Sequence, residues 1–197
     1  MSTNEGVRLG DEAARRLAST GCCQISAGLT EGEFARVEEL YGFEFADDHR
    51  SFLAAGLPLD APNEQRPRWV DWRAGDPDII RERLDWPVEG VLYDVEHNDL
   101  WPDSWGERPV DTRDALAAAR LLLARVPQLV PVYSHRFLPA GRGSFGHPVL
   151  SVYQTDIICY GMDLVDYVHQ EFGGPGIDQT DARWKPRVTA PFWRDFL

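Results

Sequence analysis

The most constraining stretch of the sequence is residues 147–174, in which the hydrophobic period changes once. Residues 148–153 and 157–160 are rich in β-branched and aromatic side chains, and the polar corner 154–156 separates them. After Gly161, apolar residues recur at the spacing of one helix face. The stretch therefore predicts a β-hairpin followed by a helix that packs back on it. The residues expected on the buried face of that helix are Leu164, Tyr167, Val168 and Phe172.

Helix start and stop signals recur elsewhere in the chain. Thr30 and Glu33 have the spacing of a capping box, in which each side chain bonds the backbone N–H of the other residue. Asp76 followed by Pro77 is a second start signal, because a cap precedes a proline at the first helical position. Pro87 is expected to end that helix. Helices are predicted at residues 11–18, 31–41, 47–55, 77–86 and 113–125.

The strand signals decide the fold class. In residues 88–96, the alternation of Val91, Tyr93 and Val95 places these three side chains on one face of a predicted strand. A further strand is predicted at residues 129–138, close to the two strands of the hairpin, and such closely spaced strands favour antiparallel pairing. The predicted fold is α+β: a single domain whose mainly antiparallel sheet is covered by helices on one face.

The net charge restricts the partners of the chain. Its 197 residues carry a formal net charge of −12. Nucleic acid and anionic membrane surfaces would be repelled by this charge, so neither is an expected partner. A basic protein is the compatible partner, because an acidic field would steer it towards the chain. The alternative is that the charge serves solubility alone.

Cysteine usage and the N-terminal sequence indicate a compartment. Cys22, Cys23 and Cys159 are an odd set with an adjacent pair, which is not the pattern of a disulfide framework. The N-terminal residues lack the apolar core of a signal peptide, and no apolar run reaches the roughly 18 residues that span a bilayer. These features predict a cytoplasmic protein, since the cytoplasm keeps thiols reduced.

The segment from residue 85 to residue 111 is unusually acidic. It contains eight acidic residues and a single basic residue, Arg108. We interpret it as a docking surface for a cationic partner, with Trp101 and Trp105 as apolar anchors. A solvated loop rim is the alternative interpretation. The residues expected to contact the partner are Asp94, Glu96, Asp99, Trp101, Asp103 and Trp105.

Motifs for catalysis are missing from the sequence. The nucleophile elbow, the phosphate-binding loop and the Cys-x-x-Cys pair do not occur. The run from Glu96 to Asp99 would need a further histidine to form a metal site, and neighbouring residues on a strand point to opposite faces. We therefore assign no catalytic residue, no metal ligand and no cofactor. The rival hypothesis is a small hydrolase or metal-dependent enzyme that uses Asp94, Glu96, His97 and His135.

Several segments resemble a known family. Residues 43–53, FEFADDHRSFL, are similar to the helix entry of the SUKH superfamily, although the Leu-Pro pair that often stands there in the family is missing. Residues 86–91, 101–106 and 153–161 resemble segments of bacterial proteins grouped near this family. The resemblance divides the chain into an N-terminal extension at 1–27, a SUKH-like α+β domain at 28–174 and a tail with an aromatic end at 175–197.

The SUKH resemblance implies a function in protein binding. Many bacterial members of the family are regarded as immunity proteins against secreted toxins, and fungal members regulate cell-wall synthesis. The family has no agreed catalytic residues, so none is carried over to this chain. Together with the acidic segment, the resemblance predicts a non-enzymatic binding domain whose partner is a basic protein such as a toxin domain.

Overall fold

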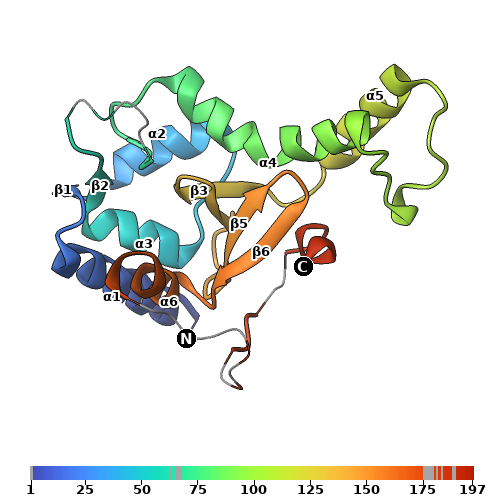
Figure 1. Cartoon of the computed structure of the whole chain (residues 1–197). Coiled ribbons are helices and arrows are strands. Elements are labelled where there is room, and N and C mark those ends of the chain that lie inside the picture. The colour runs from blue at the N-terminus through green and yellow to red at the C-terminus, as the bar shows by residue number, and fades with distance from the viewer. Residues whose placement is uncertain are drawn as a thin grey trace.

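A four-stranded antiparallel sheet lies at the centre of the molecule (Figure 1). Its strands follow one another in space as they do in sequence: β3 (Leu129–Tyr133), β4 (Arg136–Pro139), β5 (Val149–Tyr153) and β6 (Asp156–Gly161). A separate antiparallel pair is formed by β1 (Gln24–Ser26) and β2 (Leu57–Leu59). The computed structural model of the chain describes residues 2–62, 64, 68–174, 180, 182, 184–187 and 190–197.

Helices make up the rest of the regular structure. The longer ones are α1 (Ser2–Thr20), α2 (Glu31–Tyr41), α3 (Asp47–Ala55), α4 (Pro77–His97) and α5 (Thr112–Leu123). The shorter ones are η1 (Asp103–Trp105), α6 (Leu164–Val168), the π-helical turn η2 (His169–Gly173) and η3 (Trp193–Phe196). None of the helices in the described part of the chain is long and apolar enough to cross a membrane. These elements form one α+β domain, which confirms the predicted fold class.

The β5–β6 hairpin and the helix after it confirm the prediction for residues 147–174. Tyr153 pairs with Asp156 across the turn, so Gln154 and Thr155 form the corner. Gln154 adopts a positive φ of 55°, which lets the chain reverse within two residues. The side chains predicted on the inner helix face are buried, except for the last, which is partly buried: Leu164, Tyr167, Val168 and Phe172.

The strand predicted at residues 129–138 is instead a second hairpin. β3 and β4 are antiparallel, and the chain reverses at Ser134 and His135, where Ser134 has a φ of 49°. Both strands are rich in apolar residues, and the turn between them takes only two positions. The composition of the segment therefore looks like that of one continuous strand.

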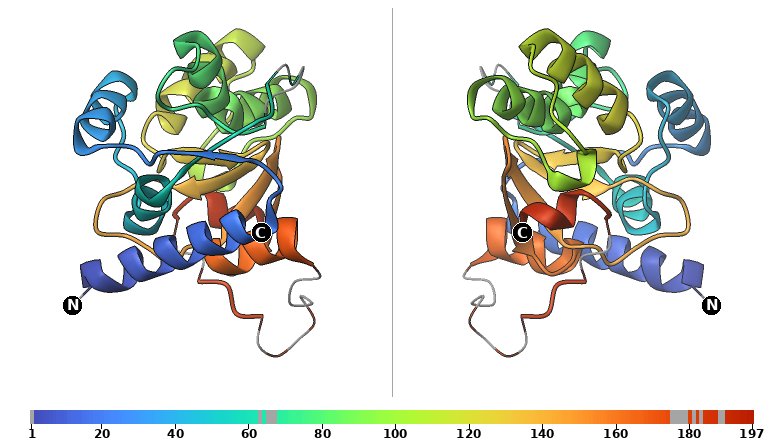
Figure 2. Two further views of the ribbon diagram at one scale, coloured as in Figure 1. Left: turned by 90° about the vertical axis from the view of Figure 1, so that its left-hand side faces the viewer. Right: turned by 90° about the vertical axis from the view of Figure 1, so that its right-hand side faces the viewer.

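Both faces of the sheet are buried at β3 and β4, whereas the sequence predicted helices on one face only. Val130 and Leu129 are neighbours on β3 and face different cores, as the two-residue period of a strand requires. Residues of α1, α2, α3 and α6 fill the first core, and residues of α5, η3 and the C-terminal half of α4 fill the second core. Figure 2 shows helices on both sides of the strands.

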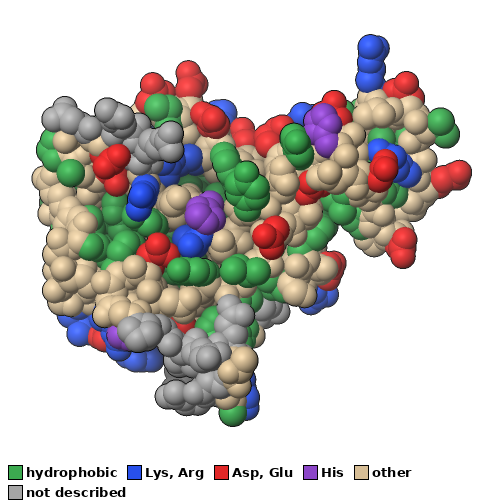
Figure 3. Space-filling view, in the orientation of Figure 1, with side chains coloured by type: hydrophobic (Ala, Val, Ile, Leu, Met, Phe, Trp, Pro, Cys, Tyr) green, Lys and Arg blue, Asp and Glu red, His purple; other side chains and the backbone are tan. Residues whose placement is uncertain are grey.

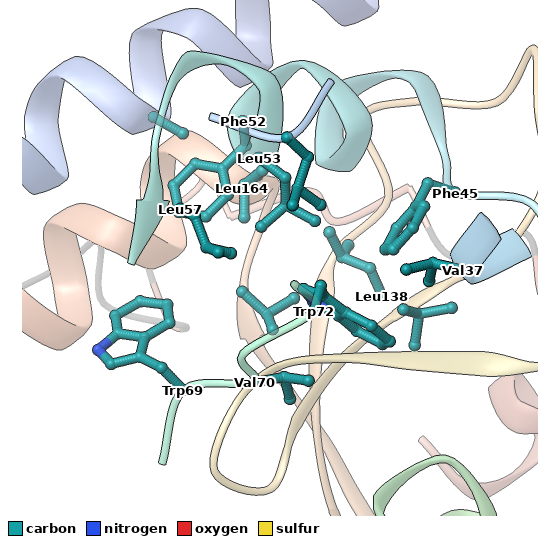
Figure 4. Close-up of a cluster of buried hydrophobic side chains, with 14 of the residues drawn as sticks. Val37, Phe45, Phe52, Leu53, Leu57, Trp69, Val70, Trp72, Leu138 and Leu164 are labelled. Atoms are coloured by element: carbon teal, nitrogen blue, oxygen red, sulfur yellow. The ribbon is translucent and has the colours of Figure 1, made fainter. Parts of the chain in front are cut away.

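Aromatic rings fill much of the first core. Trp72 lies edge-to-face with the rings of Phe43 and Phe45, at centroid distances of 5.9 and 5.2 Å. Figure 4 shows the same indole close to Leu138 of β4. Arg73 anchors this segment, because its guanidinium donates hydrogen bonds to the Glu33 carboxylate of the confirmed capping box. Trp72 is therefore a core residue.

Residues 88–96 belong to the helix α4, so the strand predicted there is wrong. The helix continues through Pro87 to His97, and the helix changes direction near its middle (Figure 1), as expected where a proline removes one backbone hydrogen bond. Its buried residues recur every three or four positions on both sides of the proline, so tertiary packing sustains the helix. They are Ile80, Leu84, Pro87, Val91, Leu92, Asp94 and Val95.

α1 is part of the same packed unit as the rest of the domain, although the sequence assigned residues 1–27 to an extension. It begins nine residues before the helix predicted at 11–18. Gly10 allows α1 to approach α3 closely, because a Cβ at this position would collide with the backbone oxygen of Asp48. Ala13 and Leu17 are buried in the first core, so α1 contributes to its stability.

The C-terminal tail packs on the domain through its aromatic end. Of the tail at 175–197, residues 180, 182, 184–187 and 190–197 are among those described. Trp193 is fully buried in the second core, and its indole N–H donates to the backbone oxygen of Pro127 at 2.5 Å. Phe192 stacks on Trp105, with the two rings 5.9 Å apart and 5° from parallel.

Removing the buried indole tests the role of the tail. We expect Trp193→Ala to lower the free energy of unfolding by about 3–5 kcal/mol, because it empties a fully buried site and removes a hydrogen bond. Arg194→Ala, at the exposed neighbouring position, should change it by less than about 0.5 kcal/mol. Urea denaturation followed by circular dichroism measures both. A loss below about 1 kcal/mol for Trp193→Ala would contradict this account of the second core.

Asp48 and His49 lie side by side in α3 and are almost completely buried. The Asp48 carboxylate accepts hydrogen bonds from the backbone N–H groups of Gly146 at 2.8 Å and His49 at 2.9 Å. Burial raises the pKa of Asp48 to about 6 in spite of these hydrogen bonds. Burial also lowers the pKa of His49 to about 3. The folded state therefore favours the neutral form of both side chains.

The two pKa shifts act on stability in opposite directions. Protonated Asp48 stabilises the fold below its ordinary pKa of 3.8, and this contribution is lost as the pH rises through about 6. Neutral His49 stabilises the fold above its ordinary pKa of 6.5, and this contribution is lost as the pH falls towards about 3. Between about pH 4 and pH 6, the two slopes oppose each other, each by up to roughly 1.4 kcal/mol per pH unit.

Single substitutions should separate these two slopes. We expect Asp48→Asn to lose stability on acidification between about pH 6 and pH 4 more steeply than the wild type, because only the His49 contribution is left. His49→Phe should instead gain stability on acidification between about pH 6 and pH 4, because only the Asp48 contribution is left. Urea melts at three pH values give the slopes, so any constant cost of a substitution cancels. Identical slopes in all three proteins would show that neither group titrates differently on folding.

Candidate functional site

A groove lies between α4 and the β5–β6 hairpin. It consists of two adjoining pockets with volumes of about 610 and 390 Å³. The larger pocket follows α4 as far as the hairpin tip, and the smaller pocket continues to the turn between β3 and β4. We call this surface the α4 groove, and the side chains that give it its character are Glu82, Asp85, Trp86, Glu89, Tyr93 and Tyr153.

Two contacts hold the hairpin tip against α4. Gly90 permits a close approach, because a Cβ at this position would lie 2.8 Å from the Cα of Gln154. One helical turn later, the Asp94 carboxylate accepts hydrogen bonds from the Thr155 N–H at 3.0 Å and from the Thr155 hydroxyl at 2.6 Å. It also accepts one from the Asn98 side-chain amide at 2.6 Å. These contacts fix the wall of the groove that the hairpin supplies.

Aromatic rings line the larger pocket and stay strongly exposed. Trp86, Tyr93 and Tyr153 have exposed fractions of 44, 48 and 60%. In the described part of the chain, the large hydrophobic residues that are strongly exposed include three aromatic ones, and these are the three. The indole N–H of Trp86 donates to the backbone oxygen of Val152 at 3.3 Å, and its ring lies 6.4 Å from that of Tyr153. The rings are therefore held in place without being covered.

Carboxylates accompany these rings along α4. Among the described residues, neither Glu82 nor Asp85 has an ion-pair partner, whereas Glu89 pairs with Arg120 at 2.9 Å. Figure 3 shows acidic side chains gathered along the ridge that α4 forms. Carboxylates and the faces of aromatic rings both attract positive charge, so the groove is suited to a cation. The acidic residues that line the larger pocket are Asp78, Glu82, Asp85 and Glu89.

Asp94 does not belong to the exposed acidic face that the sequence predicted. It is only 4% exposed, and its carboxylate is occupied by the hydrogen bonds to Thr155 and Asn98. In a strand it would have pointed away from Val95, but in α4 it faces the hairpin tip. Its role is therefore to hold the hairpin, and it is not available to a partner.

The other predicted contact residues lie at or beyond the end of α4. Glu96, Asp99 and Asp103 are exposed, and Asp99 pairs with Arg108 at 3.2 Å. Trp101 and Trp105 lie edge-to-face at 5.1 Å and are partly buried on the second core. These two rings therefore pack within the domain, and the apolar surface next to the carboxylates comes from residues outside the predicted contact set.

The residues of the rival enzyme hypothesis do not form a metal-binding group. Glu96 and His97 are exposed at the end of α4, with 3.6 Å between a carboxylate oxygen and Nε2, whereas Asp94 is buried. His135 lies at the β3–β4 turn, where Nδ1 is 3.2 Å from the Ser134 hydroxyl and burial lowers the pKa of the ring. In the described part of the chain, no three His, Cys, Asp or Glu side chains are grouped to hold a metal ion.

The residues of the α4 groove lie outside the predicted contact set, although the acidic segment included Asp85 and Glu89, because the predicted helix stopped at Pro87. Continued past the proline, the helical spacing places Glu82, Trp86, Glu89 and Tyr93 on one face. That signal was present in the sequence. The contribution of Tyr153 was not, because only the tertiary contact of the hairpin with α4 brings it to the groove.

Comparisons with known proteins do not connect the chain to a family. A scan against protein-family models finds no match, and no curated protein and no solved structure matches the chain. The resemblance to the SUKH superfamily therefore stays a prediction.

Replacing Asp94 tests its assignment as a buried clamp. We expect Asp94→Ala to lower the free energy of unfolding by about 2–4 kcal/mol, because the N–H and hydroxyl of Thr155 lose a charged acceptor below the surface. Glu96→Ala, two residues along and exposed, should change it by less than about 0.5 kcal/mol. Urea melts of both variants provide the measurement. If both substitutions changed the free energy of unfolding by equally small amounts, Asp94 would not act as a buried clamp.

Proposed function

We propose that the protein is a non-enzymatic binding module that takes a cationic segment of another protein into the α4 groove. The observation that carries the proposal is the combination of exposed aromatic rings and carboxylates without an ion-pair partner in one groove of the described chain. Carboxylates attract a cation by charge, and aromatic faces attract it through their quadrupoles. The net charge of −12 would also speed the approach of a basic partner.

The spacing of the carboxylates favours a role in binding over a role in folding. Glu82, Asp85 and Glu89 lie three or four residues apart on α4. Like charges at this spacing destabilise a helix by about 0.2–0.5 kcal/mol per pair. A bound cation would relieve this repulsion and would cover the exposed rings. The exposed rings and the repulsion between Glu82 and Asp85 are unfavourable in the free protein, and a bound cation would relieve both.

This proposal moves the acidic docking surface towards the N-terminal half of α4. Glu96 lies seven residues after Glu89, so it extends the same helix face, and the exposed Asp99 and Asp103 continue beyond the helix. The surface therefore keeps part of the predicted contact set. Its apolar anchors become Trp86 and the two tyrosines of the groove.

The biological role that fits this chemistry is the one implied by the SUKH resemblance. The partner would be a basic protein such as a secreted toxin domain, and the chain would neutralise it in the cytoplasm. The free thiols of Cys22 and Cys23 support a reducing compartment. Toxin neutralisation is the narrower part of the proposal, and binding of a cationic protein segment is the broader part.

Binding of a simple cationic probe tests the broader proposal. The probe is a twelve-residue peptide of four Gly-Ser-Lys repeats. We expect it to shift the NMR signals of backbone amides in α4 and at the β5–β6 turn, with an affinity that falls steeply between about 50 and 300 mM salt, because exposed charges are screened.

A pair of double variants separates the groove from the net charge. Glu82→Gln with Asp85→Asn should weaken peptide binding about five- to tenfold, or roughly 1 kcal/mol. The matched control, Glu5→Gln with Glu39→Gln, removes the same charge from exposed positions outside the groove and should weaken it less than about twofold. If both double variants lost the same affinity for the peptide, binding would depend on net charge alone, and the proposal would be wrong.

A further inference from the structure

We infer that the α4 groove selects an arginine side chain, whose guanidinium stacks on Trp86 and pairs with the carboxylates beside it. This inference rests on the proposed function and names the cationic group that the groove would recognise. The most exposed aromatic residues of the described chain line the larger pocket. The same pocket is lined by Glu82 and Asp85, which have no ion-pair partner among the described residues.

Helix geometry surrounds Trp86 with carboxylates. Glu82 lies four residues before it and Glu89 three residues after it. Side chains at these spacings are neighbours on a helix, with about 5–6 Å between their Cβ atoms. The hydrogen bond to Val152 occupies the only polar atom of the indole, so the exposed part of the ring is carbon surface. A cation over this ring therefore has carboxylates on both sides along the helix axis.

This combination suits a guanidinium better than an ammonium group. A guanidinium is planar and weakly hydrated, so it can lie flat on an indole while the N–H groups at its edge donate to carboxylates. Two parallel hydrogen bonds to one carboxylate add further strength. An ammonium group is compact and strongly hydrated, so it gains less from the ring and cannot make the two-pronged contact.

Arginines already lie over aromatic rings within the protein itself. The Arg50 guanidinium is 4.1 Å from the centre of the Phe34 ring and donates a hydrogen bond to the Glu31 carboxylate at 2.7 Å. Arg136 lies 3.8 Å from the centre of the Tyr160 ring. The first of these contacts holds a guanidinium between a ring and a carboxylate, which is the environment that the groove offers to a partner.

Three arginines of the chain lie near the groove and are engaged elsewhere or only weakly paired within it. Arg83 lines the smaller pocket near Glu82, and its guanidinium donates to the backbone oxygen of Arg68 at 2.8 Å. Arg81 lines the larger pocket, but its guanidinium lies 5.3 Å from the Tyr41 ring and donates to the backbone oxygen of Leu40 at 3.4 Å. Arg120 pairs with Glu89, and both side chains are more than half exposed. Such an exposed pair is weak, so an incoming guanidinium can compete for Glu89.

Two probe peptides of equal length and charge test the selection. One has four Gly-Ser-Arg repeats and the other four Gly-Ser-Lys repeats. We expect the wild-type protein to bind the arginine peptide at least about fivefold more tightly in calorimetry, since stacking and two-pronged pairing favour the guanidinium. A third peptide, with trimethyllysine in place of lysine, should bind less tightly than the arginine peptide.

Variants of Trp86 connect the preference to the ring. Trp86→Leu should bring the affinity ratio close to one while salt-dependent binding of both peptides persists, and Trp86→Phe, which keeps a ring, should retain part of the preference. Leu121→Ala removes an exposed apolar side chain from α5, outside the groove, and should leave the ratio unchanged. Urea melts establish whether each variant is folded. If Trp86→Leu does not fold, the ratio of the two peptide affinities in the wild-type protein tests the selection of arginine.

The outcomes separate this inference from the proposed function. Equal affinity for the arginine and lysine peptides in the wild type, or tighter binding of the trimethyllysine peptide, would overturn the selection of arginine and leave the binding module standing. A preference that survives in Trp86→Leu would overturn the stacking contact. Failure of all three peptides to bind in the groove would remove both proposals.

Discussion

The contact between α4 and the tip of the β5–β6 hairpin determines the shape of the candidate site. Asp94 and Thr155 are 61 positions apart in the sequence, and their hydrogen bonds join the helix to the sheet. A buried carboxylate is costly unless its oxygens accept hydrogen bonds, so this pairing strongly specifies how the two elements dock. Gly90 lets the backbones approach, and the result is a groove with Trp86 on one wall and Tyr153 on the other.

Burial of the sheet on both faces at β3 and β4 leaves the helices to form much of the surface. α4 packs one side of its length into the two cores and presents the other side to solvent. Side chains on that outer side contribute little to the cores, so their chemistry is free to serve a partner. Glu82 and Asp85 are an example, because they line the groove and belong to neither core.

Local signals predicted the elements whose stabilising contacts are themselves local. The capping box of Thr30 and Glu33 and the hairpin of residues 147–174 were predicted because their hydrogen bonds and periods lie within short segments. The prediction for residues 88–96 was wrong because Pro87 usually ends a helix, and burial on both sides of the proline overrode this preference. The same error placed Asp94 on the surface, whereas Glu96 and Asp99 are exposed.

The sequence by itself determined the α+β class, the hairpin followed by a helix and the acidic charge, because composition and short-range periodicity carry this information. Only the tertiary structure decided that both sheet faces are buried at β3 and β4, that Trp105 packs on Phe192, and that Trp86 and Tyr153 line one groove. The physical reason is that these contacts join residues far apart in the chain, and their energy comes from burial and hydrogen bonding that exist only once the elements have docked.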